Sequence, residues 1–246
     1  MKTLVMLLAG PLQSWGVRST FNKRDTYPYP TRSGVLGMLA SASGIGRSQP
    51  LPPHWEQAGL LVRRDRRGHV LTDFHTVGAE RPPGRRMITA DHKPRTTPVI
   101  TERDYLTDAA FTAYLTAPGE VIEDLAQALR TPRWAPYLGR RGCPPALPVL
   151  LGTSDRPPQR LAEHLPLYRE PLCDGNRLQI ALLQEATEGQ DADTHISDVP
   201  QERTPDRRAF KARGALELFN EHSADDCAGT GIRGFRGLAE ALKETR

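Results

Sequence analysis

The chain has 246 residues, of which 38% are hydrophobic and 25% are charged, and its formal net charge is +4. That length can bury the core of one large domain or of two small ones, and no apolar run reaches membrane-spanning length. The three cysteines are odd in number and far apart, so they indicate neither a disulfide framework nor a zinc site.

The first residues superficially resemble a signal peptide, because Met1-Lys2 precedes the apolar run Thr3–Ala9. The run is short, however, and the sequence after it is a poor cleavage context. We therefore expect a cytoplasmic protein with no membrane partner. No residue pattern in the chain predicts a cofactor or a metal.

The first predicted element is a strand over Leu4–Ala9, an unbroken apolar run that is typical of a strand covered on both faces. A loop follows in which a tryptophan stands among small polar residues. Such a loop offers a flat stacking face with hydrogen-bond donors around it, as a single-stranded nucleic-acid site requires. Alternatively, the segment is only a linker beside a core strand. The loop residues are Gln13, Ser14, Trp15 and Gly16.

The next predicted element is a short helix whose apolar stripe lies within Val35–Ala42. Thr31 and Ser33 are both suitable N-caps, and either choice leaves Arg32 beside the helix N-terminus. The first N–H groups of a helix lack intrahelical partners. The N-terminus beside Arg32 is therefore a candidate anion site.

A protruding hairpin is predicted in the middle of the chain. Strands are expected over 60–62, 70–77 and 99–106, with a charged turn at 63–68. The long polar segment 78–98 between the last two strands is basic, and loops of this length without their own core are usually functional or disordered. A hairpin here would carry arginines to a polyanion without disturbing the domain.

Charge is distributed unevenly along the chain. Residues 63–103 hold ten basic and five acidic side chains, and residues 130–141 hold four arginines and no acid. Residues 185–206 hold seven acids and one arginine, which predicts a solvated linker. Arginine supplies 28 of the 33 basic groups and is the better bidentate phosphate ligand, although a GC-rich genome would also enrich it.

Three more elements complete the predicted core: a strand over 110–115, a helix over 120–130 and a strand over 147–151. Together with the earlier elements they give an α+β fold, with a ferredoxin-like (RRM-like) βαββαβ core and a protruding β-hairpin thumb. Sheets of this kind often bind RNA. No recognition-motif aromatic signature is present to require it.

The segment from Trp134 to Pro145 is a second candidate nucleic-acid site. Tyr137 can stack on a base, Gly139 allows close backbone approach, and the pair Arg140 and Arg141 can hold phosphates. A proline-rich connector with incidental charge explains the same residues equally well.

Several motifs of the chain together resemble one family, the family-five CRISPR-associated proteins, and within it the CasD subunits of type I-E Cascade. The resemblance covers about the first two-thirds of the chain, in order and with sensible spacing. It weakens after Gly152. The motifs are AGPLQSWG (9–16), PTRSGVLG (30–37), DFHTV (73–77), RDYLTDAAF (103–111) and PYLGRRGCP (136–144).

The resemblance implies a domain layout. An RNA-binding domain would span 1–153, with the thumb at about 78–101, and a small β-containing region would span 154–213. Residues 214–246 have no counterpart in the resemblance, and we interpret them as an extension that is partly disordered.

The resemblance also implies a non-catalytic subunit that binds the 5′ handle of the CRISPR guide RNA and caps the backbone of the complex. Its partners would be the backbone subunit and the large subunit, and it would act on target DNA only through the complex. The implied RNA-binding residues are Gln13, Ser14, Trp15, Gly16, Arg32, Ser33, Gly34, His75, Arg85, Arg86, Arg103, Tyr137, Gly139, Arg140 and Arg141.

Two other functions compete with this one. Relatives in type I-C systems process their own repeat RNA without a metal, which requires a general base and acid near the 2′-OH and a cation for the phosphorane charge. His75 with Lys93 or an arginine is the best available candidate set for that chemistry, although a strand histidine is more often a structural group. The third possibility is a protein scaffold that uses its basic surface to bind acidic partners.

Overall fold

The computed structural model describes residues 1–17, 19–20, 22–78, 93, 97–172, 177–187, 189–203 and 208–245. The predicted thumb tip, with Arg85 and Arg86, lies outside these described residues. Within them, no helix is both long enough and apolar enough to cross a membrane.

The fold is α+β and is built on a seven-stranded sheet in which every neighbouring pair of strands is antiparallel. The strand order is β11-β12-β10-β5-β8-β1-β9. The bounds are β1 (Lys2–Ala9), β5 (Gly59–Arg66), β8 (Ala110–Ala117), β9 (Leu150–Ser154), β10 (Arg177–Glu185), β11 (Thr194–Arg203) and β12 (Arg208–Ser223).

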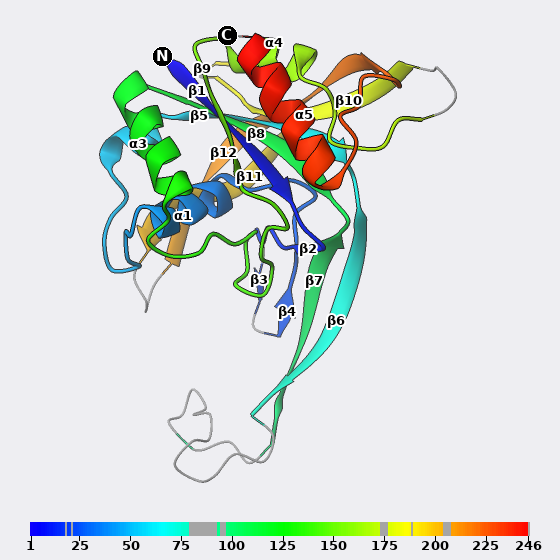
Figure 1. The fold of residues 1–246 in the computed structure, drawn as a ribbon. Coiled ribbons are helices and arrows are strands. Elements are labelled where there is room, and N and C mark those ends of the chain that lie inside the picture. The colour runs from blue at the N-terminus through cyan, green and yellow to red at the C-terminus, as the bar shows by residue number, and fades with distance from the viewer. Residues whose placement is uncertain are drawn as a thin grey trace.

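A second, smaller sheet carries a two-stranded arm that extends away from the main body (Figure 1). The arm consists of β6 and β7, which pair antiparallel along their whole length, from His69 opposite Thr107 to Val77 opposite Val99. Three two-residue strands complete this sheet at the base of the arm. The bounds are β2 (Leu12–Gln13), β3 (Ser19–Thr20), β4 (Lys23–Arg24), β6 (His69–Val77) and β7 (Val99–Thr107).

Helices cover both faces of the main sheet, because β1 is apolar on both faces. Leu4, Met6 and Leu8 pack in the cluster that contains α1 and α3, whereas Val5 and Leu7 pack in the cluster that contains α4 and α5. The prediction of an inner strand is thus confirmed. The helix bounds are α1 (Arg32–Ala42), α2 (Pro53–Glu56), α3 (Gly119–Arg130), α4 (Pro158–His164) and α5 (Gly231–Glu244).

The charged segment 63–68 differs from its prediction. It was expected to be a turn, but β5 continues through Arg66 and the turn is confined to Arg67-Gly68. The strand tolerates the charges because Arg63 and Asp65 are fully buried and bind each other at 2.7 Å. Asp65 also accepts a hydrogen bond from the Thr112 hydroxyl of β8.

The C-terminal part of the chain also differs from its prediction. Strands β10 to β12 extend the main sheet through the β10–β5 pairing. The region after residue 154 therefore shares its hydrophobic core with the region before it. Residues 214–245, expected to be partly disordered, form the second half of β12 and α5. Leu238 and Leu242 of α5 are buried against the sheet, because α5 is amphipathic.

Candidate nucleic-acid interface

Two of the predicted site segments contact each other. The loop at 13–16 and the segment at 137–141 meet where the Ser14 amide donates to the Leu138 carbonyl at 3.0 Å. Gly139 has a φ of +85°, and a Cβ at this position would lie 1.7 Å from the Ser14 carbonyl oxygen. Only glycine fits such a contact, so the approach of the two segments depends on Gly139.

Trp15 connects the third predicted segment, the start of α1 at residues 32–34, to the 13–16 loop and the 137–141 segment. A Cβ at Gly34, in the first turn of α1, would lie 2.7 Å from the indole Cε3 atom. A Cβ at Gly139 would lie 3.5 Å from the same atom. The indole therefore packs between two glycines, and the three segments form one continuous part of the molecule.

The role predicted for Trp15 needs correction, because the indole is only 1% exposed. Its Nε1 donates to the Gln13 side-chain oxygen at 3.0 Å, and the Gln13 amide donates in turn to the carbonyls of Leu8 and Ala109. Neither side chain is available to RNA. Trp15 and Gln13 instead fix the loop on the sheet, and Ser14 is buried beside them with its hydroxyl bound to the Asp104 carbonyl.

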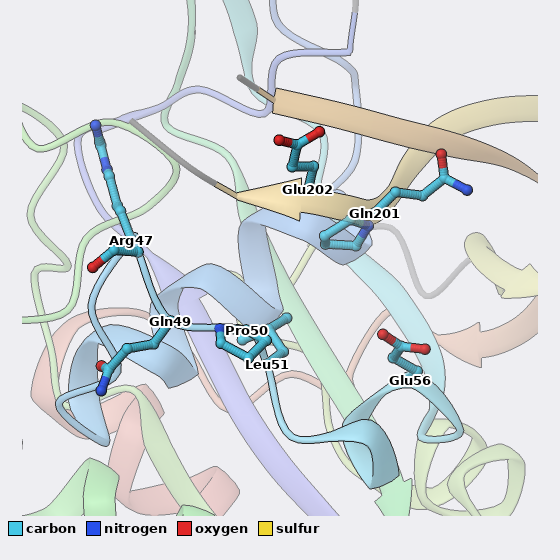
Figure 2. Close-up of a pocket in the computed structure, with 9 residues that line it drawn as sticks. Arg47, Gln49, Pro50, Leu51, Glu56, Gln201 and Glu202 are labelled. Atoms are coloured by element: carbon cyan, nitrogen blue, oxygen red, sulfur yellow. The ribbon is translucent and has the colours of Figure 1, made fainter. Parts of the chain in front are cut away.

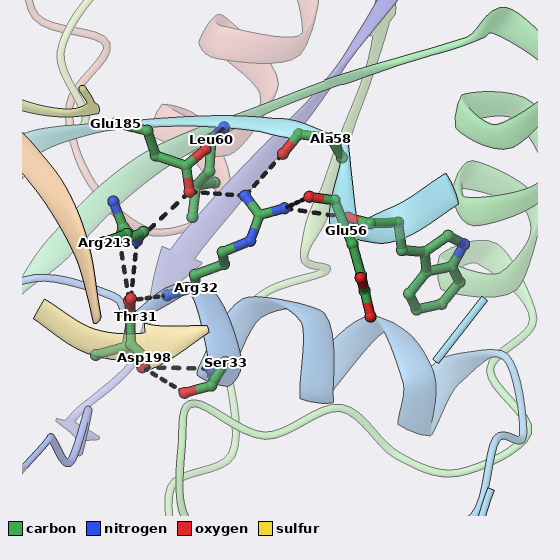
Figure 3. Close-up of polar contacts among 11 residues, drawn as sticks. Thr31, Arg32, Ser33, Glu56, Ala58, Leu60, Glu185, Asp198 and Arg213 are labelled. Carbon is green, nitrogen blue, oxygen red and sulfur yellow. Dashed lines mark hydrogen bonds and ion pairs between the residues drawn. The ribbon is translucent and has the colours of Figure 1, made fainter. Parts of the chain in front are cut away.

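Arg32 also differs from its prediction as a phosphate ligand, because its side chain is buried (Figure 3). The guanidinium donates to the carbonyls of Trp55, Glu56 and Ala58 and to the Glu185 carboxylate at 2.6 Å. These four bonds use all four N–H groups of the two terminal nitrogens, Nη1 and Nη2. The side chain therefore ties α1 to α2, to the residue before β5 and to the end of β10 instead of facing solvent.

The N-terminus of α1 is an anion site, but its anion comes from the protein itself. The Arg32 backbone N–H donates to the Asp198 carboxylate at 2.6 Å, and the Thr31 hydroxyl caps the helix by accepting from the Gly34 N–H. Of the two candidate caps, Thr31 is therefore the one observed. Arg213 binds the same Asp198 carboxylate at 2.8 Å.

The sequence reasoning missed these acidic partners. The acidic segment was predicted to be a solvated linker, yet Glu185 ends β10 and Asp198 lies buried in β11. The signal that could have identified Asp198 is the period of a strand, because Ile196 and Asp198 share the buried face and Ser197 between them is exposed. A buried carboxylate requires a cationic partner, and here Arg32 and Arg213 are those partners.

The two neighbouring arginines of the second segment have different surroundings. Arg140 donates to the carbonyls of Asp104, Arg24 and Asp25, and its guanidinium lies 4.8 Å from the centre of the Tyr105 ring. Arg141 is exposed. Arg140 thus ties the segment to β4 and β7, and Arg141 is the arginine of the pair that faces solvent.

The arm holds two more predicted residues. His75 on β6 is partly exposed, and its Nδ1 lies 3.5 Å from the Asp73 carboxylate. Arg103 on β7 is opposite Asp73 in the register and donates to the Thr101 hydroxyl at 3.2 Å. Arg103 precedes Asp104, whose carbonyl accepts from both the Ser14 hydroxyl and Arg140, so it lies beside the contact between the 13–16 and 137–141 segments. His75, opposite Thr101, lies farther out on the arm.

The accessible part of the predicted site is therefore smaller than expected. The predicted residues of the three joined segments that are exposed or half-exposed are Gly16, Ser33, Gly34, Tyr137, Gly139, Arg140 and Arg141. Cys143 lies beneath them, and burial raises the pKa of its thiol despite the nearby Arg140. That cysteine is a neutral packing residue.

A shallow pocket of about 230 Å³ lies elsewhere, between the 47–51 loop, α2 and the end of β11 (Figure 2). Its lining has Pro50, Leu51 and Pro200 as apolar walls and includes none of the predicted site residues. Among the described residues, no group of three or more His, Cys, Asp or Glu side chains is placed to hold a metal ion.

Comparison with known proteins defines the class of this chain. The family model described as "CRISPR-associated protein (Cas_Cas5)" matches residues 3–215, and the chain belongs to this family. Among curated proteins, it is 37% identical over 201 residues to "CRISPR system Cascade subunit CasD" of Escherichia coli (strain K12). That alignment covers 74% of this chain and 87% of the relative.

Solved structures give the same assignment. The chain matches a chain of a structure titled "CRISPR RNA-guided surveillance complex" with a TM-score of 0.82 and 35% identity, over 98% of this chain and 99% of that one. A second match, "Crystal structure of Cas protein", has a TM-score of 0.65 and 31% identity, over 93% and 98% of the two chains.

Proposed function

We propose that this chain is the CasD-type subunit of a type I-E Cascade, where it binds the 5′ handle of the guide RNA and caps the backbone without cutting the RNA. The observation that carries the proposal is the packing of the 13–16 loop, the α1 N-terminus and the 137–141 segment around Trp15. The similarity to a chain of an RNA-guided surveillance complex supports it.

The proposal includes a finer description of the fold. Strands β9-β1-β8-β5 are adjacent in the order expected for a ferredoxin-like sheet, with α1 between β1 and β5 and α3 between β8 and β9. The β6–β7 arm would be the base of the thumb. Because α4 and α5 cover one sheet face and α1 and α3 the other, RNA would bind at the loops and not on the sheet.

In this proposal the RNA contacts are divided between buried and exposed residues. Trp15, Gln13 and Arg32 would set the shape of the surface from below. Loop amides, the Tyr137 ring and the Arg141 guanidinium would contact bases and phosphates. Contacts with the backbone subunit, the large subunit and the guide RNA follow from the same assignment.

Binding of a single-stranded RNA that carries the repeat-derived 5′ handle tests the proposal. We expect the Kd to rise steeply with salt, and Arg141→Ala to weaken binding and to reduce the salt slope by about 0.7, the value for one phosphate contact on a single strand. The matched control is Arg160→Ala on α4, an exposed arginine on the other side of the sheet. Equal affinities of wild type and Arg141→Ala at every salt concentration would remove Arg141 from the interface.

Incubation of the purified chain with its full repeat RNA separates this function from the endoribonuclease. The proposal predicts intact RNA after incubation in the absence of metal. Cleavage at one position that His75→Ala abolishes would instead establish catalysis on the arm, where His75 contacts Asp73.

A further inference from the structure

The three tryptophans of the chain differ sharply in exposure. Trp15 is 1% exposed and Trp55 is 5% exposed, whereas Trp134 is 47% exposed. An indole of which nearly half remains in water leaves a large apolar surface exposed. Trp134 belongs to none of the interactions that build the interface described above.

Trp134 is nevertheless held in a fixed position. Its backbone N–H donates to the Ser41 carbonyl at 3.3 Å, and the Arg133 N–H donates to the Ala42 carbonyl at 2.8 Å. These bonds satisfy carbonyls in the last turn of α1. The Arg133 side-chain stem also packs closely against Gly44, where a Cβ would lie 3.0 Å from Cγ. The ring is therefore presented by an anchored segment.

That segment runs along α1 towards the proposed RNA interface. At one end Trp134 is bound to the last turn of the helix, and at the other end Gly139 packs against Trp15, which contacts Gly34 in the first turn. The eight-residue advance from Gly34 to Ala42 corresponds to about 12 Å of helix. A single RNA strand that contacts Tyr137 and Arg141 can thus continue to Trp134.

The charge of the segment favours a nucleic acid over a protein as the occupant. Residues 125–154 contain Arg130, Arg133, Arg140 and Arg141 and no Asp or Glu. Arg130 and Arg133 precede Trp134 in the sequence and are exposed, and Arg140 and Arg141 follow it. An aromatic face flanked by cations is the arrangement with which proteins hold single-stranded RNA, stacking the base and neutralising the phosphates.

We propose that Trp134 is a stacking platform for an unpaired RNA base, next to the contacts made by Tyr137 and Arg141. The inference rests on the proposed function, since it extends the same RNA path. The stacking role that the sequence suggests for Trp15 belongs, in this proposal, to Trp134.

Tryptophan fluorescence of the full chain tests the proposal directly, because Trp134 is the exposed emitter. Titration with the single-stranded 5′-handle RNA should quench this emission and protect it from acrylamide. In Trp134→Phe, the RNA-induced change in emission should vanish, because the exposed indole is gone. RNA binding should be largely retained, because the phenyl ring still stacks. In Trp134→Ala, affinity should fall about 5- to 150-fold, the range for loss of one stacked base.

The outcomes separate this inference from the proposed function. If Arg141→Ala weakens handle binding but Trp134→Ala binds like wild type and RNA leaves the exposed emission unchanged, the stacking platform is wrong and the proposed function stands. If the wild-type chain does not bind the handle RNA, the proposed function itself fails. Unchanged RNA affinity with lost co-assembly would identify Trp134 as a protein contact, which also overturns the stacking role.

Discussion

Two sets of arginines in this molecule have opposite surroundings. Arg32 and Arg63 are enclosed in the body, where backbone carbonyls and a carboxylate converge on each guanidinium. Arg133 and Arg141 are exposed on the 130–141 segment. The first pair stabilises the fold, and the second pair is available to a polyanion.

The difference follows from the number of acceptors that the fold provides. A buried guanidinium must satisfy up to five donors, and an unpaired buried charge is very costly. Arg63 meets this requirement with Asp65 and the carbonyls of Ala162, Leu165 and Pro166. The number of arginines therefore does not measure the surface available to RNA. The first two predictions below test whether a given arginine stabilises the fold or is free to bind RNA.

The largest effect is expected for Arg63→Met. Removal of the guanidinium leaves the Asp65 carboxylate buried without its cation, and breaking a buried pair in this way costs about 3–5 kcal/mol of unfolding free energy. Urea unfolding measures the loss. Arg160→Ala, at an exposed position, is the control and should change the unfolding free energy by less than about 0.5 kcal/mol. A similarly small loss for Arg63→Met would contradict the stabilising role of the buried arginines.

An intermediate effect is expected at the neighbouring pair in the proposed interface. Arg140→Ala removes hydrogen bonds to three carbonyls and should lower stability by about 1–2 kcal/mol. Arg141→Ala should leave the unfolding free energy nearly unchanged and act on RNA affinity alone. Urea unfolding and RNA titration of both variants measure the unfolding free energy and the Kd. Equal losses of unfolding free energy would show that Arg141 also has a structural partner.

The smallest effect concerns His222, which is buried on the same side of the sheet as Arg63. Burial, and then the charge of Arg63, lowers the pKa of His222 below its ordinary value of 6.5. The unfolded chain therefore takes up the proton first as the pH falls. Stability should decrease as the pH drops below about 6.5 and level off below the folded-state pKa.

Urea unfolding from pH 8 to pH 5 measures this decrease. The expected result is that His222→Gln has a flatter profile than wild type over that range. Gln57→Ala, an exposed substitution that changes no titratable group, supplies the control and should retain the wild-type slope. A His222→Gln profile parallel to wild type would show that the buried imidazole does not cause the decline.

The local elements of the fold could be predicted from the sequence because their signals lie within a few residues. The apolar run of β1, the stripe and cap of α1, the two strands of the arm and the amphipathic α3 all have such signals, and all are present. The predicted proximity of the 13–16 and 137–141 segments came from family resemblance, not from any local pattern.

The burial of the site residues could not be predicted in this way, because their partners are distant in the sequence. Asp198 lies 166 positions from Arg32, and Glu185 lies 153 positions from it. Arg32 and Arg141 look alike until the fold brings these carboxylates to one of them. The same holds for Trp15, whose exposure is decided by Gly34 and Gly139 on two other segments.

The position of one indole between two glycines also constrains how this surface can change in evolution. A methyl group at residue 34 would collide with the ring of Trp15 and lie 3.0 Å from the Thr31 hydroxyl oxygen. Both obstacles are side chains, so a lineage that shortens the ring at residue 15 gains freedom at position 34. At residue 139 the obstacle is the Ser14 main chain, and no exchange of side chains relieves it. The two glycines thus differ in kind, one replaceable through a compensating substitution and the other tied to the path of the backbone itself.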